Sequence, residues 1–173
     1  HAQAQTSSTT MDLNWDAVHC HVVRGRAAYF RSMVAIVIVV MAYGAASATI
    51  TTTGNISPAY PGGEPDPWSP GSELVIGNTA NGSLNVSGGS DIVSAGGTVA
   101  FNPNVIGSAV VTGSGSSWTN NQDLIVGVFG NGQLSVLQGA QVSNHGASLG
   151  HINGVGSLLV ADPGSEWLNS DNV

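Results

Sequence analysis

The stretch ELVIGNTANGSLNVSGGSDIV at residues 73–93 recurs without a gap as DLIVGVFGNGQLSVLQGAQVS at residues 123–143. The second half of this unit recurs too, because GSAVVTGSGSSW at 107–118 is followed by GSLLVADPGSEW at 156–167. A shorter core of Gly, Ser or Gln, Leu or Ala, any residue and Val begins at positions 82, 107, 132 and 156. The chain is therefore organised by an internal repeat whose elementary unit has about 25 residues.

Apolar residues alternate with polar ones inside each unit, as at Leu134 and Val136. Period-two alternation bounded by turn dipeptides such as Asn131-Gly132 predicts short β-strands rather than helices. A unit of about 25 residues cannot bury an apolar face alone and must stack on its neighbours. We therefore predict an all-β fold, a β-solenoid with coils of about 25 residues spaced about 4.8 Å apart.

Stacking in register predicts ladders of equivalent side chains along the inside of such a rod. One inward ladder consists of Leu84, Ala109, Leu134 and Leu158, and a second of Val86, Val111, Val136 and Val160. A β-propeller, with about 40 to 50 residues per blade, and a two-sheet sandwich are the alternatives. The half-repeat favours the solenoid, because inner and outer strands of a propeller blade lie in different surroundings and should not resemble one another.

The N-terminal region has the pattern of an export signal. Arg24, Arg26 and Arg31 precede the apolar run MVAIVIVVMAYGAA at 33–46, which ends in the small residues Ala46-Ser47-Ala48. This arrangement predicts a secretory signal peptide with a signal helix, cleaved after Ala48. A membrane anchor is the alternative, but it usually needs about 20 apolar residues. We expect the protein to be secreted or held at the cell surface.

Four segments are expected along the chain. Residues 1–23 are unassigned, 24–48 form the signal peptide, 49–67 are a linker or N-terminal cap, and 68–173 hold the solenoid repeats. The sequence begins with His rather than Met and stops where a third long copy should begin, so we expect a fragment of a longer reading frame.

Composition excludes several classes of function. No Lys, Arg, Cys or Met follows Ala48, whereas eight Asp and Glu residues do, the first being Glu64 and the last Asp171. Nucleic-acid binding needs cations that replace the counterions on phosphate, so it is excluded, and a charge-driven grip on anionic lipid is excluded as well. The single cysteine, Cys20, lies before the signal core, so disulfides cannot stabilise the exported part.

The repeat motifs resemble a known group of proteins. The pattern L-x-[VI]-G, then G-x-L-x-V, then G-A, is present as LIVGVFGNGQLSVLQGA at 124–140, and a Gly-Ser-x-Trp element is present as PGSEW at 163–167. It is similar to repeats of bacterial autotransporter-type passenger proteins and of PEP-CTERM-associated repeat proteins. The resemblance covers residues 68–173 and implies a right-handed single-stranded β-helix that acts in adhesion or as extracellular matrix.

Two glycine-containing motifs could suggest ligand sites. GVFGNG at 127–132 looks like a phosphate loop, but such loops lead into a helix, whereas this one leads into the strand QLSV. GGSD at 88–91 resembles part of a calcium-binding roll, but the aligned copy QGAQ at 138–141 lacks the Asp. We interpret the first as a structural turn and expect no repeated calcium sites.

Two pairs of residues have side chains that could form a site. His145 and His151 are too few for a metal site, because three donors are normally needed, and we expect solvated turn histidines. Asp162 and Glu166 could act as acid and base in a polysaccharide lyase or hydrolase, but the previous copy has Gly113 and Ser117 in their places.

The tryptophans recur with the long repeat, at Trp68, Trp118 and Trp167. A sugar-binding stripe is one interpretation. We favour the other, in which each is a packing residue at a corner that closes the coil.

We therefore expect an exported, acidic, non-enzymatic β-solenoid that serves as a stalk or adhesive surface. It would offer extended rows of Ser, Thr, Asn and Gln to surface glycans or other matrix proteins. No catalytic residue, cofactor or metal site is expected, nor is membrane contact by the repeats. A carbohydrate-active β-helix enzyme whose catalytic part is missing or unrecognised is the alternative. An ice-binding solenoid is a third hypothesis, which needs flat Thr rows, and TITTTG at 49–54 is a single run.

Overall fold

The computed structural model describes residues 47–63 and 66–171. The predicted signal helix and the unassigned segment before it lie outside these residues. Among the described residues no helix is long and apolar enough to cross a membrane.

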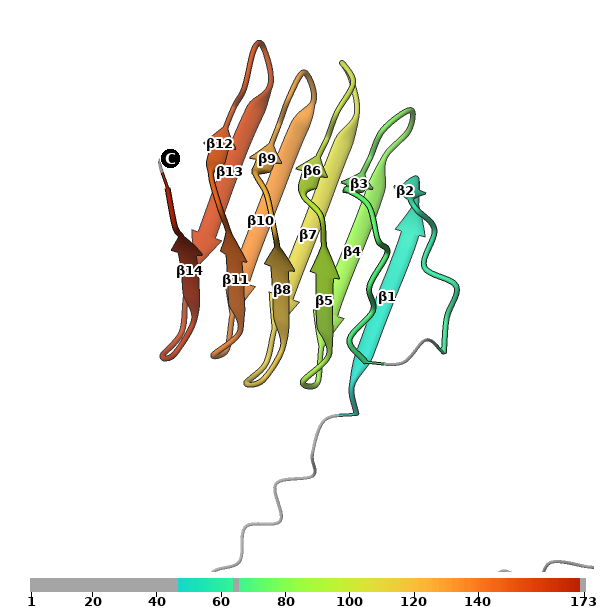
Figure 1. Ribbon diagram of the computed structural model, residues 1–173. Coiled ribbons are helices and arrows are strands. Elements are labelled where there is room, and N and C mark those ends of the chain that lie inside the picture. The colour runs from blue at the N-terminus through green and yellow to red at the C-terminus, as the bar shows by residue number, and fades with distance from the viewer. Residues whose placement is uncertain (1–46, 64–65, 172–173) are drawn as a thin grey trace, which may run out of the picture. The chain divides into compact units, whose positions relative to one another are not determined.

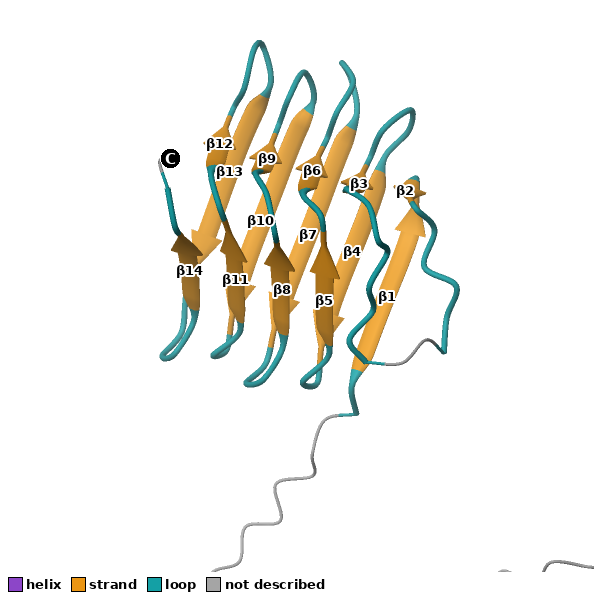
Figure 2. Cartoon of the chain, viewed as in Figure 1, coloured by secondary structure: helices purple, strands orange, loops and turns teal. Residues whose placement is uncertain are grey.

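The described chain consists of short strands joined by turns (Figures 1 and 2). The strands are β1 (Thr49–Gly54), β2 (Ile56–Ser57), β3 (Leu74–Ile76), β4 (Gly82–Ser87), β5 (Asp91–Ser94), β6 (Gly97–Val99), β7 (Ile106–Thr112), β8 (Ser117–Asn120), β9 (Leu124–Val126), β10 (Asn131–Leu137), β11 (Gln141–Asn144), β12 (Ala147–Leu149), β13 (Val155–Val160) and β14 (Glu166–Asn169).

These strands form three sheets. Sheet A has the order β1-β4-β7-β10-β13, sheet B the order β12-β9-β6-β3-β2, and sheet C the order β14-β11-β8-β5. From β3 onward every third strand returns to the same sheet, so that three strands make one turn of the chain (Figure 1). We call these turns coil 1 (β3, β4, β5), coil 2 (β6, β7, β8), coil 3 (β9, β10, β11) and coil 4 (β12, β13, β14).

The stacking confirms the predicted β-solenoid of about 25 residues per coil. Neighbouring coils pair in parallel, with Leu84 opposite Ala109, Ala109 opposite Leu134, and Leu134 opposite Leu158. A propeller or a two-sheet sandwich would not return each successive coil to the same three parallel sheets. The repeat observed in the sequence is therefore the coil itself.

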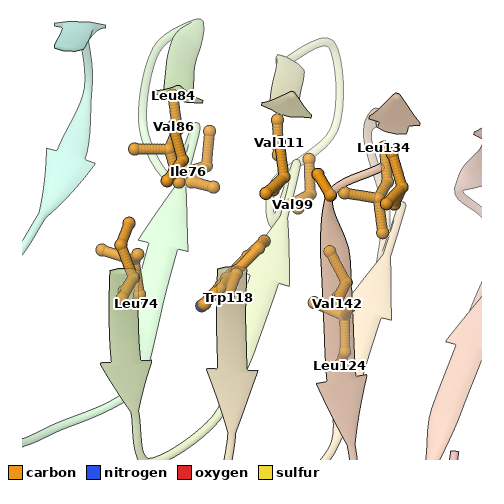
Figure 3. Close-up of a cluster of buried hydrophobic side chains, with 14 of the residues drawn as sticks. Leu74, Ile76, Leu84, Val86, Val99, Val111, Trp118, Leu124, Leu134 and Val142 are labelled. Carbon is orange, nitrogen blue, oxygen red and sulfur yellow. The ribbon is translucent and has the colours of Figure 1, made fainter. Parts of the chain in front are cut away.

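The core lies inside the three sheets and consists of the predicted ladders with additions from sheets B and C (Figure 3). Leu84, Val86, Val111 and Val136 have no exposed surface. Val160 belongs to the same ladder but is 40% exposed, because coil 4 is the last coil described. Burying each Leu or Val side chain contributes about 1.5 to 3 kcal/mol, so the ladders and the apolar residues of sheets B and C stabilise the solenoid together.

Two reversed strands cover the N-terminal end of the solenoid. β1 pairs antiparallel with β4, placing Thr52 opposite Leu84, and β2 pairs antiparallel with β3. Trp68 then forms a parallel bridge with Ile92 on sheet C. Its indole packs edge-on against the Tyr60 ring, with 4.9 Å between the ring centroids. Part of the segment expected to be a linker or cap, residues 49–67, is therefore paired directly to coil 1.

Candidate functional surface

Among the described residues, the outer face of sheet A carries no charged side chain, whereas the outer face of sheet C carries Asp91 and Glu166. Along each strand the buried positions point inward, so the alternate positions point out. The outward positions of the five strands are Thr49, Thr51, Thr53, Ser83, Asn85, Ser87, Ile106, Ser108, Val110, Thr112, Asn131, Gln133, Ser135, Leu137, Val155, Ser157 and Leu159. We call this set the A face.

Apolar residues on the A face are arranged in stripes that follow the coils. Coil 2 presents Ile106 and Val110, and coil 4 presents Val155 and Leu159. Coil 3, between them, presents polar residues in the same two rows, including Ser135 opposite both Val110 and Leu159. Ile106, Val155 and Leu159 are each at least half exposed. In these two rows apolar and polar coils therefore alternate across the face, following the long repeat of the sequence, and coil 3 adds Leu137 outside them.

All carboxylates among the described residues lie away from the A face and contact a neighbouring coil. Asp91 accepts a 2.5 Å hydrogen bond from the Ser117 hydroxyl, and Glu73 accepts one from Thr98. Asp66 accepts one from the Asp91 backbone N–H at 2.6 Å. The acidic side chains of the solenoid thus serve as links between successive coils.

The remaining carboxylates also contact a neighbouring coil, at other corners of the solenoid. Asp123 accepts a 3.0 Å hydrogen bond from the backbone N–H of Gly146, and Asp171 lies 4.0 Å from the imidazole Nδ1 of His145. The two candidate catalytic acids are also engaged: Asp162 accepts a bond from the Gln138 N–H at 3.1 Å, and Glu166 one from Gln141 Nε2 at 3.3 Å.

Asp162 and Glu166 are positioned by different parts of coil 4. Asp162 lies in the turn after β13, and Glu166 begins β14 on the outside of sheet C. Each carboxylate contacts the coil beneath it, and both side chains belong to exposed residues. Their contacts are those of links between coils.

A shallow groove of about 540 Å³ runs along the corner where sheet C passes into sheet B. Its lining is polar apart from Ile125 and includes Glu73, Asn121, Asp123 and His145. At this corner the imidazole Nδ1 of His145 lies 3.9 Å from Asp123 Oδ1. The groove lies beside acidic corner residues, but its two carboxylates already accept hydrogen bonds from Thr98 and Gly146.

The two histidines lie at opposite ends of β12. His145 precedes the strand, whereas His151 follows it and lies 3.4 Å from the Ser148 hydroxyl through its Nδ1. Among the residues that the structure describes, no group of three or more His, Cys, Asp or Glu side chains is placed to hold a metal ion.

The loop at 127–132 leads from β9 into β10, so the expected strand-to-strand connection is confirmed. Gly127 has a φ of +78°, and a Cβ there would lie 2.2 Å from the carbonyl oxygen of Val155 in coil 4. Gly132 is equally constrained, because its Cβ would meet the carbonyl oxygen of Val99 in coil 2 at 2.6 Å. These glycines allow successive coils to approach closely.

GGSD at 88–91 forms the turn between β4 and β5. Asp91 opens β5 and directs its carboxylate to Ser117, and the Gly89 N–H donates a 3.0 Å hydrogen bond to the Ser116 hydroxyl. The motif therefore connects coil 1 to coil 2.

The tryptophans point into the solenoid, which confirms their packing role and rules out an outer sugar-binding stripe. Trp118 has no exposed surface, and Trp68 is almost as deeply buried. Their predicted place at a corner was wrong, however, because Trp118 lies within β8 and Trp167 within β14.

Sequence reasoning missed a row of inward polar side chains in sheet C, of which Ser94, Asn120 and Asn144 are buried and Asn169 is partly buried. Ser94, Asn120, Asn144 and Asn169 occupy equivalent inward positions on β5, β8, β11 and β14. The Ser94 hydroxyl donates to Asn120 Oδ1 at 2.9 Å, and Asn144 Nδ2 donates to Asn169 Oδ1. Trp167 Nε1 also donates to Asn144 Oδ1 at 2.7 Å.

The sequence contains a pattern that indicates this row. Each of the four residues follows, by two positions, an inward Ile, Trp or Val, so it has the phase of the core. We call the row the internal polar ladder.

No protein-family model, no curated protein and no solved structure matches this chain. Function must therefore be argued from the surface itself. A broad, regular and uncharged β-face suits contact with another extended surface better than the enclosure of a small molecule.

Proposed function

We propose that the protein is an exported structural or adhesive surface protein in which the solenoid is a rigid spacer and the A face is the contact surface. The single observation that carries this proposal is the absence of charge on the five-stranded outer face of an otherwise purely acidic solenoid. Its Ser, Thr, Asn and Gln side chains offer donors and acceptors in regular rows, suited to surface glycans or other matrix proteins as partners.

The engagement of the carboxylates supports a role without catalysis. General acid and base chemistry requires carboxyl groups free to exchange protons with a substrate. In the described residues the carboxyl groups instead contact neighbouring coils, as Asp91 does with Ser117 and Asp162 with Gln138. These contacts favour the structural role over that of a carbohydrate-active enzyme.

Export and family membership are part of the proposal. The pattern that predicts a signal peptide ends at Ala48, and β1 begins at the next residue, Thr49. Cleavage there would leave the capping strand whole, which is consistent with processing before folding. The repeat motifs support a relationship to autotransporter-type or PEP-CTERM-associated repeat proteins.

We also propose that the coil winds in a right-handed sense. Connections between parallel strands of one sheet are right-handed in the great majority of proteins. An experimentally phased crystal structure tests this winding.

Expression in a bacterial host tests export. We expect N-terminal sequencing of the material outside the cytoplasm to begin at Thr49, and an antibody against the solenoid to label intact cells. Replacing Ala46 and Ala48 by bulky residues should retain the uncleaved chain, because the peptidase needs small residues at these positions. Unprocessed protein confined to the cytoplasm of cells carrying the unchanged sequence would contradict the proposal.

Adhesion through the A face has its own test. Beads coated with the protein should adhere to glycan-bearing or matrix-coated surfaces, and the Ser108→Glu substitution should reduce this adhesion. The matched substitution Ser143→Glu, on sheet C, should leave it unchanged. Equal adhesion by all three proteins would place the contact elsewhere.

A further inference from the structure

We infer that the A face is the docking surface for a second copy of this chain. The inference deepens the proposed function and rests on it, because it names a partner for the same face. The pairing is side by side, with the two A faces in contact and the core of each solenoid left intact.

The charge distribution favours a second copy as the occupant. The chain has a formal net charge of −7 at pH 7, so two copies repel one another wherever their carboxylates meet. Among the described residues, sheet C carries Asp91 and Glu166 on its outer face, and the Glu73 carboxylate lies against Thr98 of sheet B. The A face is therefore the broad sheet face on which this repulsion is weakest. Pairing there also spares the desolvation of charged groups, and the cores of protein interfaces are depleted in charge for that reason.

The alternation of stripes is compatible with two-fold symmetry. A two-fold axis along β10, in the plane between two facing sheets, lays coil 3 on coil 3 and coil 2 on coil 4 of the other copy. Val110 and Ile106 of one copy then meet the stripe of Val155 and Leu159 of the other. In such an isologous contact each apolar stripe is covered by an apolar stripe of the other copy, and β10 packs on β10 of the other copy.

The overlap of the two faces predicts a weak dimer. With the axis along β10, strands β7, β10 and β13 of one copy oppose β13, β10 and β7 of the other. Three strands about 4.8 Å apart and about 20 Å long cover about 300 Å² on each copy. The total of about 600 Å² lies below the area of about 1,000 Å² that a stable specific interface buries. We therefore expect a concentration-dependent dimer rather than a permanent one.

Coil 4 provides a matched pair of variants. Leu159, on the A face, is 53% exposed, and Leu168, on the outside of sheet C, is 51% exposed. Leu159→Glu and Leu168→Glu therefore remove the same side chain, from the same coil, at the same exposure, and add the same charge. Only the first of these charges enters the proposed interface.

Sedimentation velocity of the purified 173-residue chain, from about 5 to about 500 μM, tests the inference, since weak interfaces need such concentrations. We expect the unchanged protein and Leu168→Glu to shift from monomer to dimer over this range, and Leu159→Glu to remain monomeric. All three proteins keep residues 1–46, so association through that segment is common to them.

The isosteric variant Gln133→Glu provides an independent check should Leu159→Glu melt at a lower temperature. Gln133 lies near the centre of the A face, where β10 faces β10, so two added charges oppose one another and the dimer should be lost. A monomeric unchanged protein at the highest concentration would overturn the inference. The inference would also be overturned if Leu159→Glu and Leu168→Glu formed dimers equally well, or if both lost the dimer to the same extent. Because the assay uses purified protein, its failure leaves the tests of export and adhesion standing.

Discussion

The indole Nε1 of Trp118 donates a 3.0 Å hydrogen bond to the hydroxyl of Ser94, one coil below it in sheet C. Both groups are buried, and the same hydroxyl donates onward to Asn120. The bond joins the apolar core to the internal polar ladder and links coil 1 to coil 2.

Ser94→Ala should lower the free energy of unfolding by about 1 to 3 kcal/mol, because the indole N–H and the Asn120 oxygen both lose a buried partner. Urea unfolding measured by circular dichroism checks this value. Ser108→Ala removes the same atom from the A face and should change stability by less than about 0.5 kcal/mol. Equal effects of the two substitutions would show that the buried bond contributes nothing.

Trp118→Ala should destabilise the solenoid by about 3 to 5 kcal/mol, because the indole is fully buried and leaves a cavity between coils. Trp167→Ala is the matched control, since the equivalent indole in coil 4 is only half-buried. Comparison of the two urea midpoints checks the difference. A larger loss at Trp167 than at Trp118 would contradict the packing argument.

Val136→Asp should abolish cooperative unfolding, because it places a carboxylate in the fully buried Val ladder between coils 2 and 4. Ser135→Asp, the adjacent residue pointing outward, should keep a cooperative thermal transition. Melting followed by far-ultraviolet circular dichroism distinguishes them. An unchanged transition in Val136→Asp would refute the inward assignment of this ladder.

Gly132→Ala should destabilise the fold by about 1 to 3 kcal/mol, because the added methyl group meets backbone atoms of Gly127 and Val99 at 2.5 and 2.6 Å. Gly96→Ala should have a smaller effect, since its nearest neighbour would lie 3.2 Å away. Thermal denaturation of both variants provides the test. Full stability of Gly132→Ala would mean that neighbouring coils can separate locally.

The repeat made the coil length and the two inward ladders predictable. Once the core motif at residue 82 was aligned with its copy at 107, the register of every later coil followed, and Leu84 and Ala109 do pair as expected. Periodicity works here because each coil occupies the same environment as the coil before it.

Features that break or hide the period were harder to predict. The antiparallel pairing of β1 with β4 occurs once, so the sequence repeat gives no sign of it. The internal polar ladder was overlooked because Asn and Ser near a turn usually indicate solvent, whereas Asn120 satisfies its amide against neighbouring coils. The uncharged A face depends on three-dimensional alternation over five strands, and it is invisible when residues are read singly.

The reversed strand β1 also gives the solenoid a polarity of assembly. Parallel coils can in principle template one another without limit, but a strand running the opposite way cannot continue that series. The capping function is thus separate from the repeat, and duplication of a 50-residue unit, such as that from residue 73 to residue 122, could lengthen the rod without disturbing β1. Length is then a freely evolvable trait, while the A face would widen by two strands with each duplication.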